Sequence, residues 1–448
     1  MAKVTGIDIY KLLPKTNCGD CNFPTCMAFA MQVAAKKAAF DQCPHVSDEA
    51  QSALGDAQAP PMRTVTIGAG EHELAIGGET VLFRHEEKFH HPTGVAIRVS
   101  AKMDDAEIDA RLDAIGGLRF IRVGEEIGVD LVAVDGDGAD ADRFASVVER
   151  VHGKAGLPLI LLCEDAGVLK ASLNGAAATR RPLIGPATSA NWESIAEIAA
   201  EKKLPVLVRS DALEGLAELT EELREKGIED LVLQPTASDL VGTLTQLTLL
   251  RRLSLEKVFR PLGYPTCVDV RGDTLAGQSV AAGAAVCRYA GTVVTDAATP
   301  AEILPVLTAR QNIYTDPTVP NAIEAKLYEI GSPGPDAPVI LTTNFALTYF
   351  TVAGEVENSK VPAYITVLDT EGLGVLNAYA DDKLSGEGIF KTVTAQGAMD
   401  RVSHNKLIIP GLVAVLRMDI EEESGWEVIV GPEDAAGIPH FLRTEWGG

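Results

Sequence analysis

The sequence has little positive charge. Its 448 residues include 39 lysines and arginines against 63 aspartates and glutamates, giving a formal net charge of -24. Contact with a phosphate backbone requires clustered basic residues, so this balance argues against a nucleic-acid partner and against an anionic membrane surface. No apolar run approaches the roughly 18 residues that span a bilayer, and residues 1–15 lack the apolar core of a signal peptide. We therefore expect a cytoplasmic protein.

Cysteine is also scarce, but its placement is uneven. Four of the seven lie near the N-terminus with the spacing Cys-x2-Cys-x4-Cys-x16-Cys: Cys18, Cys21, Cys26 and Cys43. Iron–sulfur clusters are held by four cysteine thiolates, and this spacing predicts a [4Fe-4S] cluster as the metal site. Structural zinc is the alternative, but it favours paired Cys-x-x-Cys hooks, of which only one is present. The Ala-rich stretch Met27–Gln42 predicts a helix between the third and fourth cysteines.

The apolar pattern divides the chain into five segments. We predict a [4Fe-4S] cluster domain over 1–57, a β-hairpin linker over 58–92, a TIM-like barrel over 93–314, a linker with a short helix over 315–338, and an α/β domain over 339–448. In the first linker, Thr64–Ile67 and Thr80–Phe83 have the composition of strands. The short helix of the second linker is expected near Asn321–Gly331.

Eight short apolar runs, each followed by an amphipathic stretch, occupy residues 93–314. Such repetition is typical of a (β/α)8 barrel, with a doubly wound sheet as the alternative. Barrel enzymes keep their active sites at the carboxyl ends of the strands, but none of the polar residues here is a histidine or forms an obvious acid–base pair. We therefore expect a scaffold or docking role. The polar residues at the carboxyl ends of these predicted strands are Asp135, Asp137, Glu164, Asp165, Thr188, Arg209, Gln234, Asp269, Arg271 and Asp296.

The C-terminal domain reads as a Rossmann-like open parallel sheet with strands over 339–344, 363–368, 406–409 and 426–430. Ligands of such sheets bind beyond the carboxyl ends of the strands, where hydroxyls, an amide and glycines occur over 342–344, 369–375 and 431–437. Glycine lets the backbone approach a ligand, and helix N-termini favour phosphate, so this edge suits a large ligand with many amides and one phosphate. Tight turns alone explain the glycines equally well.

Three segments resemble the large (gamma) subunit of the corrinoid iron–sulfur proteins, which are methyl carriers of the reductive acetyl-CoA (Wood–Ljungdahl) pathway. They are Leu13–Cys26, Thr342–Asn344 and Gly425–Pro432, and the resemblance extends over essentially the whole chain. It implies a corrinoid (cobamide) bound base-off on the C-terminal domain, with no histidine on cobalt. The absence of an Asp-x-His-x-x-Gly arrangement agrees with this expectation.

The resemblance also implies which residues contact the corrinoid, with Glu371 as a further neighbour of Thr370 below the cobalt. The implied contacts are Thr342, Thr343, Thr348, Thr370, Gly372, Leu373, Gly374, Val375, Gly431, Ala436 and Gly437.

The function implied is that of a methyl carrier in a methyltransferase system, not a stand-alone enzyme, and no catalytic residue is expected. Cob(I)amide would take a methyl group from methyltetrahydrofolate through a separate methyltransferase and pass it to the Ni-Fe-S cluster of acetyl-CoA synthase. The [4Fe-4S] cluster would reduce Co(II) to Co(I) with electrons from a low-potential donor such as ferredoxin. A small partner subunit would complete a heterodimer, and the Gly/Pro-rich segment 332–338 would let the C-terminal domain move.

Three other functions fit parts of the sequence. An iron–sulfur/flavin electron-transfer subunit is weakened by the lack of a Gly-x-Gly-x-x-Gly segment after a strand. A zinc-stabilised structural subunit would have the same cysteines but no colour. In a third possibility the barrel itself is the methyl-pterin enzyme, and the isolated chain would then transfer methyl groups without an added methyltransferase.

Overall fold

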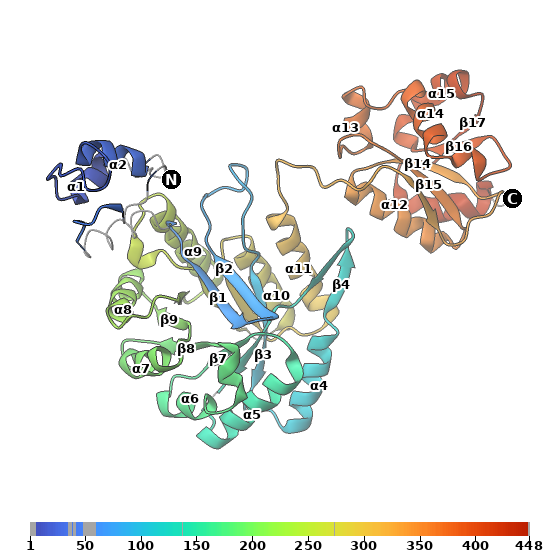
Figure 1. The fold of residues 1–448 in the computed structure, drawn as a ribbon. Helices are drawn as coiled ribbons and strands as arrows, with labels where there is room; N and C mark the ends of the chain where they lie inside the picture. Colours follow the sequence, from blue (N-terminus) through green and yellow to red (C-terminus); the bar gives the residue numbers. More distant parts are fainter. Residues whose placement is uncertain are drawn as a thin grey trace. The chain divides into compact units, whose positions relative to one another are not determined.

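The computed structural model describes residues 6–34, 38, 42–47, 60–136, 138–272 and 274–446. The chain forms two compact units, one from 1–119 and 128–314 and the other from 120–127 and 315–448. The first unit contains the N-terminal helices and an α/β barrel, and the second is a smaller α/β sheet domain (Figure 1).

Two short helices, α1 (Gly6–Leu12) and α2 (Cys26–Ala34), form the N-terminal part. Ile9, Phe29 and Val33 are buried together between them. The predicted helix over Met27–Gln42 is present as far as Ala34, and residues 35–37 and 39–41 lie outside the described part of the chain.

An antiparallel hairpin of β1 (Thr64–Ala69) and β2 (His72–Gly77) packs against the interior of the barrel. The predicted strand Thr64–Ile67 is present, whereas the predicted strand at Thr80–Phe83 is wrong. The backbone of this segment is hydrogen-bonded to a side chain and not to a neighbouring strand: Val81 O accepts a hydrogen bond from Arg251 Nη2 (2.9 Å).

Eight parallel strands form the barrel, and all eight predicted runs contain one. A single bridge between Leu233 and Thr266 joins the two ends of the sheet order, so the barrel is nearly closed and the doubly wound alternative is excluded. In chain order the strands are β3 (Gly94–Ser100), β6 (Leu131–Asp135), β7 (Leu159–Leu162), β8 (Leu183–Ala187), β9 (Val206–Ser210), β10 (Leu231–Pro235), β11 (Cys267–Asp269) and β12 (Thr292–Thr295).

Helices follow the barrel strands and surround them (Figure 1). They are α4 (Asp105–Gly116), α5 (Ala141–Ala155), α6 (Ala166–Ser172), α7 (Trp192–Lys202), α8 (Leu213–Glu225), α9 (Leu240–Leu255), α10 (Leu275–Val286) and α11 (Pro300–Tyr314), with 3-10 turns η2 (Ala176–Arg180) and η3 (Arg260–Leu262). Within the described residues, no helix combines the length and apolar character needed to cross a bilayer. A hairpin of β4 (Arg119–Arg122) and β5 (Glu125–Gly128), not expected from the sequence, interrupts the first β–α–β unit.

The second unit has a five-stranded sheet in the order β13-β15-β14-β16-β17. Four strands are parallel, as predicted: β14 (Val339–Thr343), β15 (Ala363–Leu368), β16 (Lys406–Ile409) and β17 (Glu427–Val430). The prediction of a helix near Asn321–Gly331 is wrong, because Leu327–Ile330 forms β13, which pairs antiparallel with β15.

The helices of this unit cover both faces of the sheet, and each face has its own apolar core. They are α12 (Ala346–Ser359), α13 (Val375–Ala380), α14 (Gly386–Ala395), α15 (Arg417–Ser424) and α16 (Ile438–Phe441), with shorter turns η4 (Ala398–Asp400), η5 (Gly411–Leu416), η6 (Ala435–Gly437) and η7 (Leu442–Trp446).

The Pro-rich segment 332–338 is hydrogen-bonded within this second unit. Ser403 N donates to Pro335 O (2.7 Å), the His404 ring contacts Ala337 O (2.9 Å), and Trp446 Nε1 donates to Asp336 O (3.2 Å). The compact unit itself begins earlier, at Thr315.

Candidate cofactor sites

Cys18 and Cys21 lie on the loop between the two short helices, Cys26 begins the second helix, and Cys43 lies beyond its end. Left-handed backbone at Asn17 and Gly19 (φ 50° and 82°) turns the chain after α1. Thr25 Oγ1 then accepts a hydrogen bond from Ala28 N (3.1 Å), which satisfies a first-turn amide of α2. These local features return the chain so that Cys26 begins α2.

The structure brings the four predicted cysteines into one neighbourhood. Cys21, Cys26 and Cys43 are buried in a common apolar cluster, and Cys18 is exposed. Burial raises the pKa of the Cys43 thiol, and the negative charges of Cys21, Cys18 and Cys26 raise it further. Cys43 is thus close enough to the other three cysteines to sense their charge, as expected of residues that share one metal group.

The surroundings of these sulfurs fit a thiolate-bound cluster. The backbone N–H of Asn17 donates to Cys26 Sγ (3.4 Å), while Asn17 Oδ1 accepts from Cys26 N (2.9 Å). Hydrogen bonds to cluster sulfurs and burial are the features by which a protein adjusts a cluster's reduction potential. Asn17 therefore already makes polar contacts with one of the four predicted cysteine ligands.

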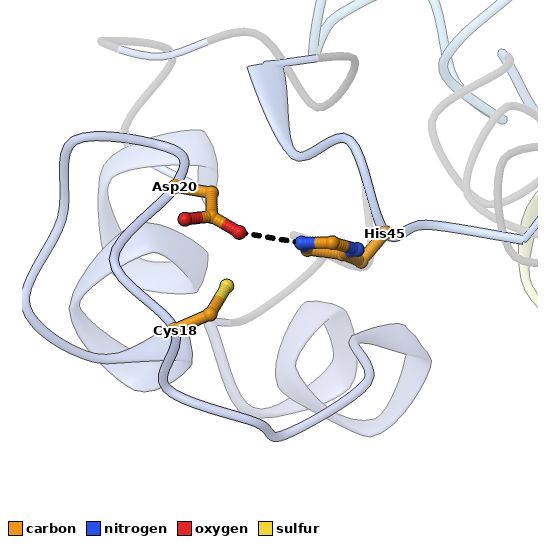
Figure 2. Close-up of side chains that lie close together, drawn as sticks. All are labelled: Cys18, Asp20 and His45. Atoms are coloured by element: carbon orange, nitrogen blue, oxygen red, sulfur yellow. Dashed lines mark hydrogen bonds and ion pairs between the residues drawn. The ribbon is translucent and has the colours of Figure 1, made fainter.

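An exposed trio lies beside Cys18. Figure 2 shows the Asp20 carboxylate and the Cys18 sulfur facing the His45 ring. His45 Nε2 and Asp20 Oδ2 are 2.6 Å apart, and candidate ligand atoms of all three residues lie within 4.8 Å of one another. The hydrogen bond from His45, and then that from Cys18, lowers the pKa of the Asp20 carboxyl. Asp20 and His45 thus flank the one exposed cysteine of the motif.

At the second predicted site, two buried hydroxyls have no partner among the described residues. Thr342 and Thr343 end β14 and are each 1% exposed, yet neither Oγ1 makes a hydrogen bond there. A buried polar group without a partner is unfavourable by about 1–3 kcal/mol. Because neighbouring strand residues point to opposite faces of the sheet, only a large ligand with polar groups, such as a corrin ring with its amide side chains, would satisfy both.

Asn344, the next residue, organises the loop after β15. Its Oδ1 accepts hydrogen bonds from Thr370 N (3.0 Å), Thr370 Oγ1 (3.0 Å) and Gly372 N (2.9 Å). Its Nδ2 donates to Asp369 Oδ1 (2.9 Å), which also accepts from Glu371 N (3.0 Å). The loop therefore has a defined shape, and Glu371 and Gly372 adopt left-handed backbone (φ 56° and 78°).

Other predicted contacts lie at the same edge of the sheet. Thr348 is in the first turn of α12, and a Cβ on Gly374 would lie 3.8 Å from its Oγ1. Leu373 precedes Gly374 and is partly buried, and Val375 is buried at the start of α13. Because β14, β15, β16 and β17 are parallel, the loops after them share one edge.

The third group of predicted contacts follows β17, and part of its hydrogen-bonding capacity is already used. Ala436 N donates to Asp434 Oδ1 (3.0 Å) and Gly437 N to Asp434 O (2.9 Å). Gly431 packs closely, since a Cβ there would lie 3.1 Å from Ile408 Cγ2. Gly431 and Gly437 thus have packing reasons for being glycine, in addition to any contact with a ligand.

The barrel mouth is filled by its own ion pairs. Arg98 is 4% exposed and pairs with Asp269, with Asp296 (2.7 Å) and with Asp135 (3.6 Å). Arg271 also pairs with Asp135 (2.7 Å) and Asp269 (3.0 Å). Each of these carboxylates is therefore engaged by a guanidinium.

Most of the remaining strand-end residues have hydrogen-bond or ion-pair partners. Glu164 pairs with Arg209, Asp165 accepts from Val168 N as the cap of α6, and Thr188 donates to Asn191 Oδ1. Gln234 is buried, with its Oε1 unpartnered among the described residues. Asp137 lies outside the described part of the chain.

Comparison with known proteins shows which family this chain belongs to. A family model described as CO dehydrogenase/acetyl-CoA synthase delta subunit matches residues 64–442, and one described as "Putative Fe-S cluster" matches residues 13–45. The corrinoid/iron-sulfur protein large subunit of Moorella thermoacetica is 43% identical over 98% of this chain and 99% of its own. The chain belongs to the family of corrinoid/iron–sulfur protein large subunits.

The acetyl-CoA decarbonylase/synthase complex subunit gamma of Methanopyrus kandleri is also similar, at 36% identity over 99% of this chain and 98% of its own. Among solved structures, the 7,8-dihydropteroate synthase from Vibrio fischeri aligns with a TM-score of 0.41 and 15% identity, over 56% of this chain and 99% of that one.

Sequence reasoning missed several residues of this corrinoid/iron–sulfur protein large subunit. His45 carries no spacing signal, and Asn344 was seen only as one polar residue of a loop, although it holds that loop together. Exposed apolar residues also lie just after the carboxyl ends of β14, β15 and β16. They are Leu347, Leu376, Leu412 and Val415.

Proposed function

We propose that this corrinoid/iron–sulfur protein large subunit is a methyl-group carrier of the reductive acetyl-CoA pathway. When bound, the base-off corrinoid would supply a nucleophilic cobalt for methyl transfer. The methyl donor would be methyltetrahydrofolate on a separate methyltransferase, and the acceptor would be the Ni-Fe-S cluster of acetyl-CoA synthase. The [4Fe-4S] cluster would supply the electron that restores oxidised cobalt. The chain itself binds, orients and shields these groups.

Cys18, Cys21, Cys26 and Cys43 hold the [4Fe-4S] cluster in this proposal. The burial of three of them and the N–H of Asn17 directed at Cys26 support it. Exposure of Cys18 leaves one edge of the cluster close to solvent, which suits electron entry from a low-potential donor such as ferredoxin.

Thr342, Thr343 and Thr348 would hold the corrin through their hydroxyls, and the loop from Thr370 to Val375, which includes Glu371, would hold it through backbone groups. Gly431, Ala436 and Gly437 would add backbone contacts from the loop after β17. The unpartnered hydroxyls of Thr342 and Thr343 support this assignment.

The hydrogen bonds of His404 support a cobalt that has no axial imidazole from this residue. Nε2 contacts Ala337 O (2.9 Å) and Nδ1 accepts from Lys406 N (3.2 Å), so this histidine is engaged within its own domain. A cobalt without a strong axial imidazole is easier to reduce, and the protein's part is to withhold that ligand.

The partners in this proposal are a small subunit that completes a heterodimer, the methyltransferase and acetyl-CoA synthase, all in the cytoplasm. Meeting two protein partners in turn requires the cobalt-bearing domain to move. Because 333–337 is hydrogen-bonded inside the second unit, we place the hinge near the beginning of that unit, at the exposed residues Pro317–Pro320, and not at 332–338.

One observation carries the proposal. A single chain of this family has both a group of four neighbouring cysteines and a sheet edge with two buried, unpartnered hydroxyls. Anaerobic purification with iron, cobalt and zinc analysis tests both sites together. We expect about four irons and up to one cobalt per chain, with a base-off visible spectrum, and methyl transfer that requires added methyltransferase. Zinc without iron would reject the proposal in favour of a zinc-stabilised structural subunit, and a flavin spectrum in favour of an electron-transfer subunit. Methyl transfer by the chain alone would instead make the barrel the methyl-pterin enzyme.

A further inference from the structure

The exposed ligand Cys18 is followed by a tight turn that fixes the position of Asp20. Gly19 has left-handed backbone (φ 82°), and its carbonyl oxygen accepts a hydrogen bond from Asn22 N (2.9 Å), which closes a turn over residues 19–22. Asp20 is the second residue of this turn. Its carboxylate and the sulfur of Cys18 lie within 4.8 Å of each other (Figure 2).

A histidine from the other end of the cysteine motif holds this carboxylate. His45 comes two residues after the fourth cysteine, Cys43, and its Nε2 is 2.6 Å from Asp20 Oδ2. An ionised carboxylate only accepts hydrogen bonds, so the His45 ring is the donor. The pair therefore joins the segment of the first cysteine to that of the fourth, beside the exposed sulfur.

Asp20 brings a negative charge to this side of the motif. Between Leu13 and Cys26 the sequence has two charged residues, Lys15 and Asp20. The Lys15 ammonium lies 5.7 Å from the ring centre of Tyr10, and within the described residues it forms no ion pair with Asp20. The carboxylate is thus held by a hydrogen bond from an imidazole and not by a cation of its own loop.

A fixed negative charge beside a ligand thiolate opposes the arrival of an electron. A reduced cluster is one charge more negative than an oxidised one, so a nearby carboxylate destabilises the reduced form more. Local charge, hydrogen bonds to the sulfurs and solvent exposure set the potentials of such clusters. A lower potential favours the transfer of one electron from the cluster to Co(II), which becomes Co(I).

We infer that Asp20, positioned by His45, lowers the reduction potential of the [4Fe-4S] cluster. Asp20 acts through its charge. His45 acts through Asp20: the two side chains are 48% and 53% exposed for His45 and Asp20, and without its partner the carboxylate is free to turn into water. The inference rests on the cluster proposed above and assigns two residues to the control of its potential.

The test is a potentiometric titration of the cluster in the full-length holoprotein, followed by its visible and EPR signals. Asp20→Asn keeps the size of the side chain and removes its charge. We expect the ratio of reduced to oxidised cluster at a fixed potential to rise about threefold, which is about 30 mV in the midpoint at about 59 mV per tenfold. Asp20→Glu keeps the charge and should stay close to the wild type.

Two further measurements separate charge from other causes. An asparagine amide could also donate to the Cys18 sulfur, but only a charge effect should shrink in about 1 M salt, where the Debye length is about 3 Å. Asp142→Asn, at an exposed position of α5, removes the same charge elsewhere and should leave the midpoint unchanged.

The role of His45 is tested by a double-variant cycle. His45→Ala should raise the midpoint by less than Asp20→Asn does, and the variant with both changes should match Asp20→Asn alone, because His45 acts through the carboxylate. About four irons per chain in every variant exclude loss of the cluster. A further shift in the double variant would overturn the positioning role of His45.

The remaining outcomes distinguish this inference from the site on which it rests. An unchanged midpoint in Asp20→Asn, with its iron retained, would overturn the inference and leave the cluster standing. Iron loss in Asp20→Asn would assign the carboxylate to retention of the cluster, which also overturns the inference. Wild-type protein without iron would overturn the [4Fe-4S] site itself.

Discussion

The side-chain amide of Asn344 accepts a hydrogen bond from the Thr370 hydroxyl (3.0 Å), so the end of one central strand fixes the loop that follows its neighbour. The same amide oxygen accepts from the backbone of Thr370 and Gly372. Thr370 is fully buried and Asn344 nearly so, which makes this arrangement hard to replace by water.

Replacement of Asn344 by alanine should therefore disturb both stability and cofactor retention. Loss of the acceptor leaves buried donors of Thr370 and Gly372 unpaired, which should lower the free energy of unfolding of this domain by about 1–3 kcal/mol. We expect corrinoid affinity to fall by about tenfold or more, measured as cobalt per chain after dialysis. Asn358→Ala, at an exposed position of α12, is the control, and cobalt retention equal in both variants would contradict the role of Asn344.

Removal of a single cysteine ligand should be visible in the metal content. Cys26→Ala is expected to reduce iron from about four per chain to three or fewer and to bleach the visible absorption of the cluster. Cys287→Ala removes an exposed cysteine far along the chain and should leave iron unchanged. Iron loss in both variants would indicate general oxidation and not a ligand set.

The buried guanidinium of Arg251 should be important for the stability of the barrel. It pairs with Glu79 (3.4 Å) and lies 5.1 Å from the ring centres of both Phe89 and Tyr289. Arg251→Ala leaves the Glu79 carboxylate buried without its partner, so we expect a loss of about 3–5 kcal/mol in urea unfolding. The exposed neighbour Arg252 provides the control, since Arg252→Ala should change the midpoint little. Equal effects of the two would refute this account.

Alkaline pH should destabilise the barrel through Tyr314. Burial raises its pKa to about 12, whereas an unfolded tyrosine ionises near 10. The contribution of this shift to stability is complete below pH 10 and decreases as pH rises towards 12, by about 1.4 kcal/mol at pH 11. Urea unfolding at pH 9, 10 and 11 measures the slope of the unfolding free energy against pH.

Tyr314→Phe should reduce that slope without abolishing it, because burial also raises the pKa of the Cys267 thiol to about 12. The exposed Tyr379 gives a control, since Tyr379→Phe should leave the slope as in the wild type. A slope unchanged by Tyr314→Phe would show that other groups cause the alkaline loss.

Limited proteolysis should locate the hinge. We expect subtilisin to cut the free protein first within Pro317–Pro320, which is exposed, and to spare 333–337, which is hydrogen-bonded to Ser403, His404 and Trp446. N-terminal sequencing of the early fragments gives the position. Resistance of both segments would remove the support for domain movement.

The barrel could be predicted from sequence because its signal is repeated eight times and each strand is a short apolar run buried on both faces. Single elements were harder. The segment before Gly331 contains helix-forming residues, yet Leu327–Ile330 is a strand, because pairing with β15 and the contact of Tyr328 with Tyr349 (ring centres 4.6 Å apart) outweigh local propensity.

The hairpin of β4 and β5 was missed for a different reason. Its turn uses Val123 and Gly124, both with left-handed backbone (φ 52° and 76°), and valine gives no turn signal. At the sites, spacing predicted the cysteines and position at a strand end predicted the threonines, but Asn344 acts through contacts between segments distant in sequence. Only the folded chain reveals such contacts.

Thr342 and Thr343 have one more consequence. If a bound ligand satisfies both hydroxyls, the domain without that ligand is less stable by roughly 2–6 kcal/mol, about 1–3 kcal/mol for each hydroxyl. Any ligand that satisfies them also acts as a folding ligand. The abundance of this protein in a cell should therefore rise and fall with the supply of corrinoid, because chains that lack it would be the first to be degraded.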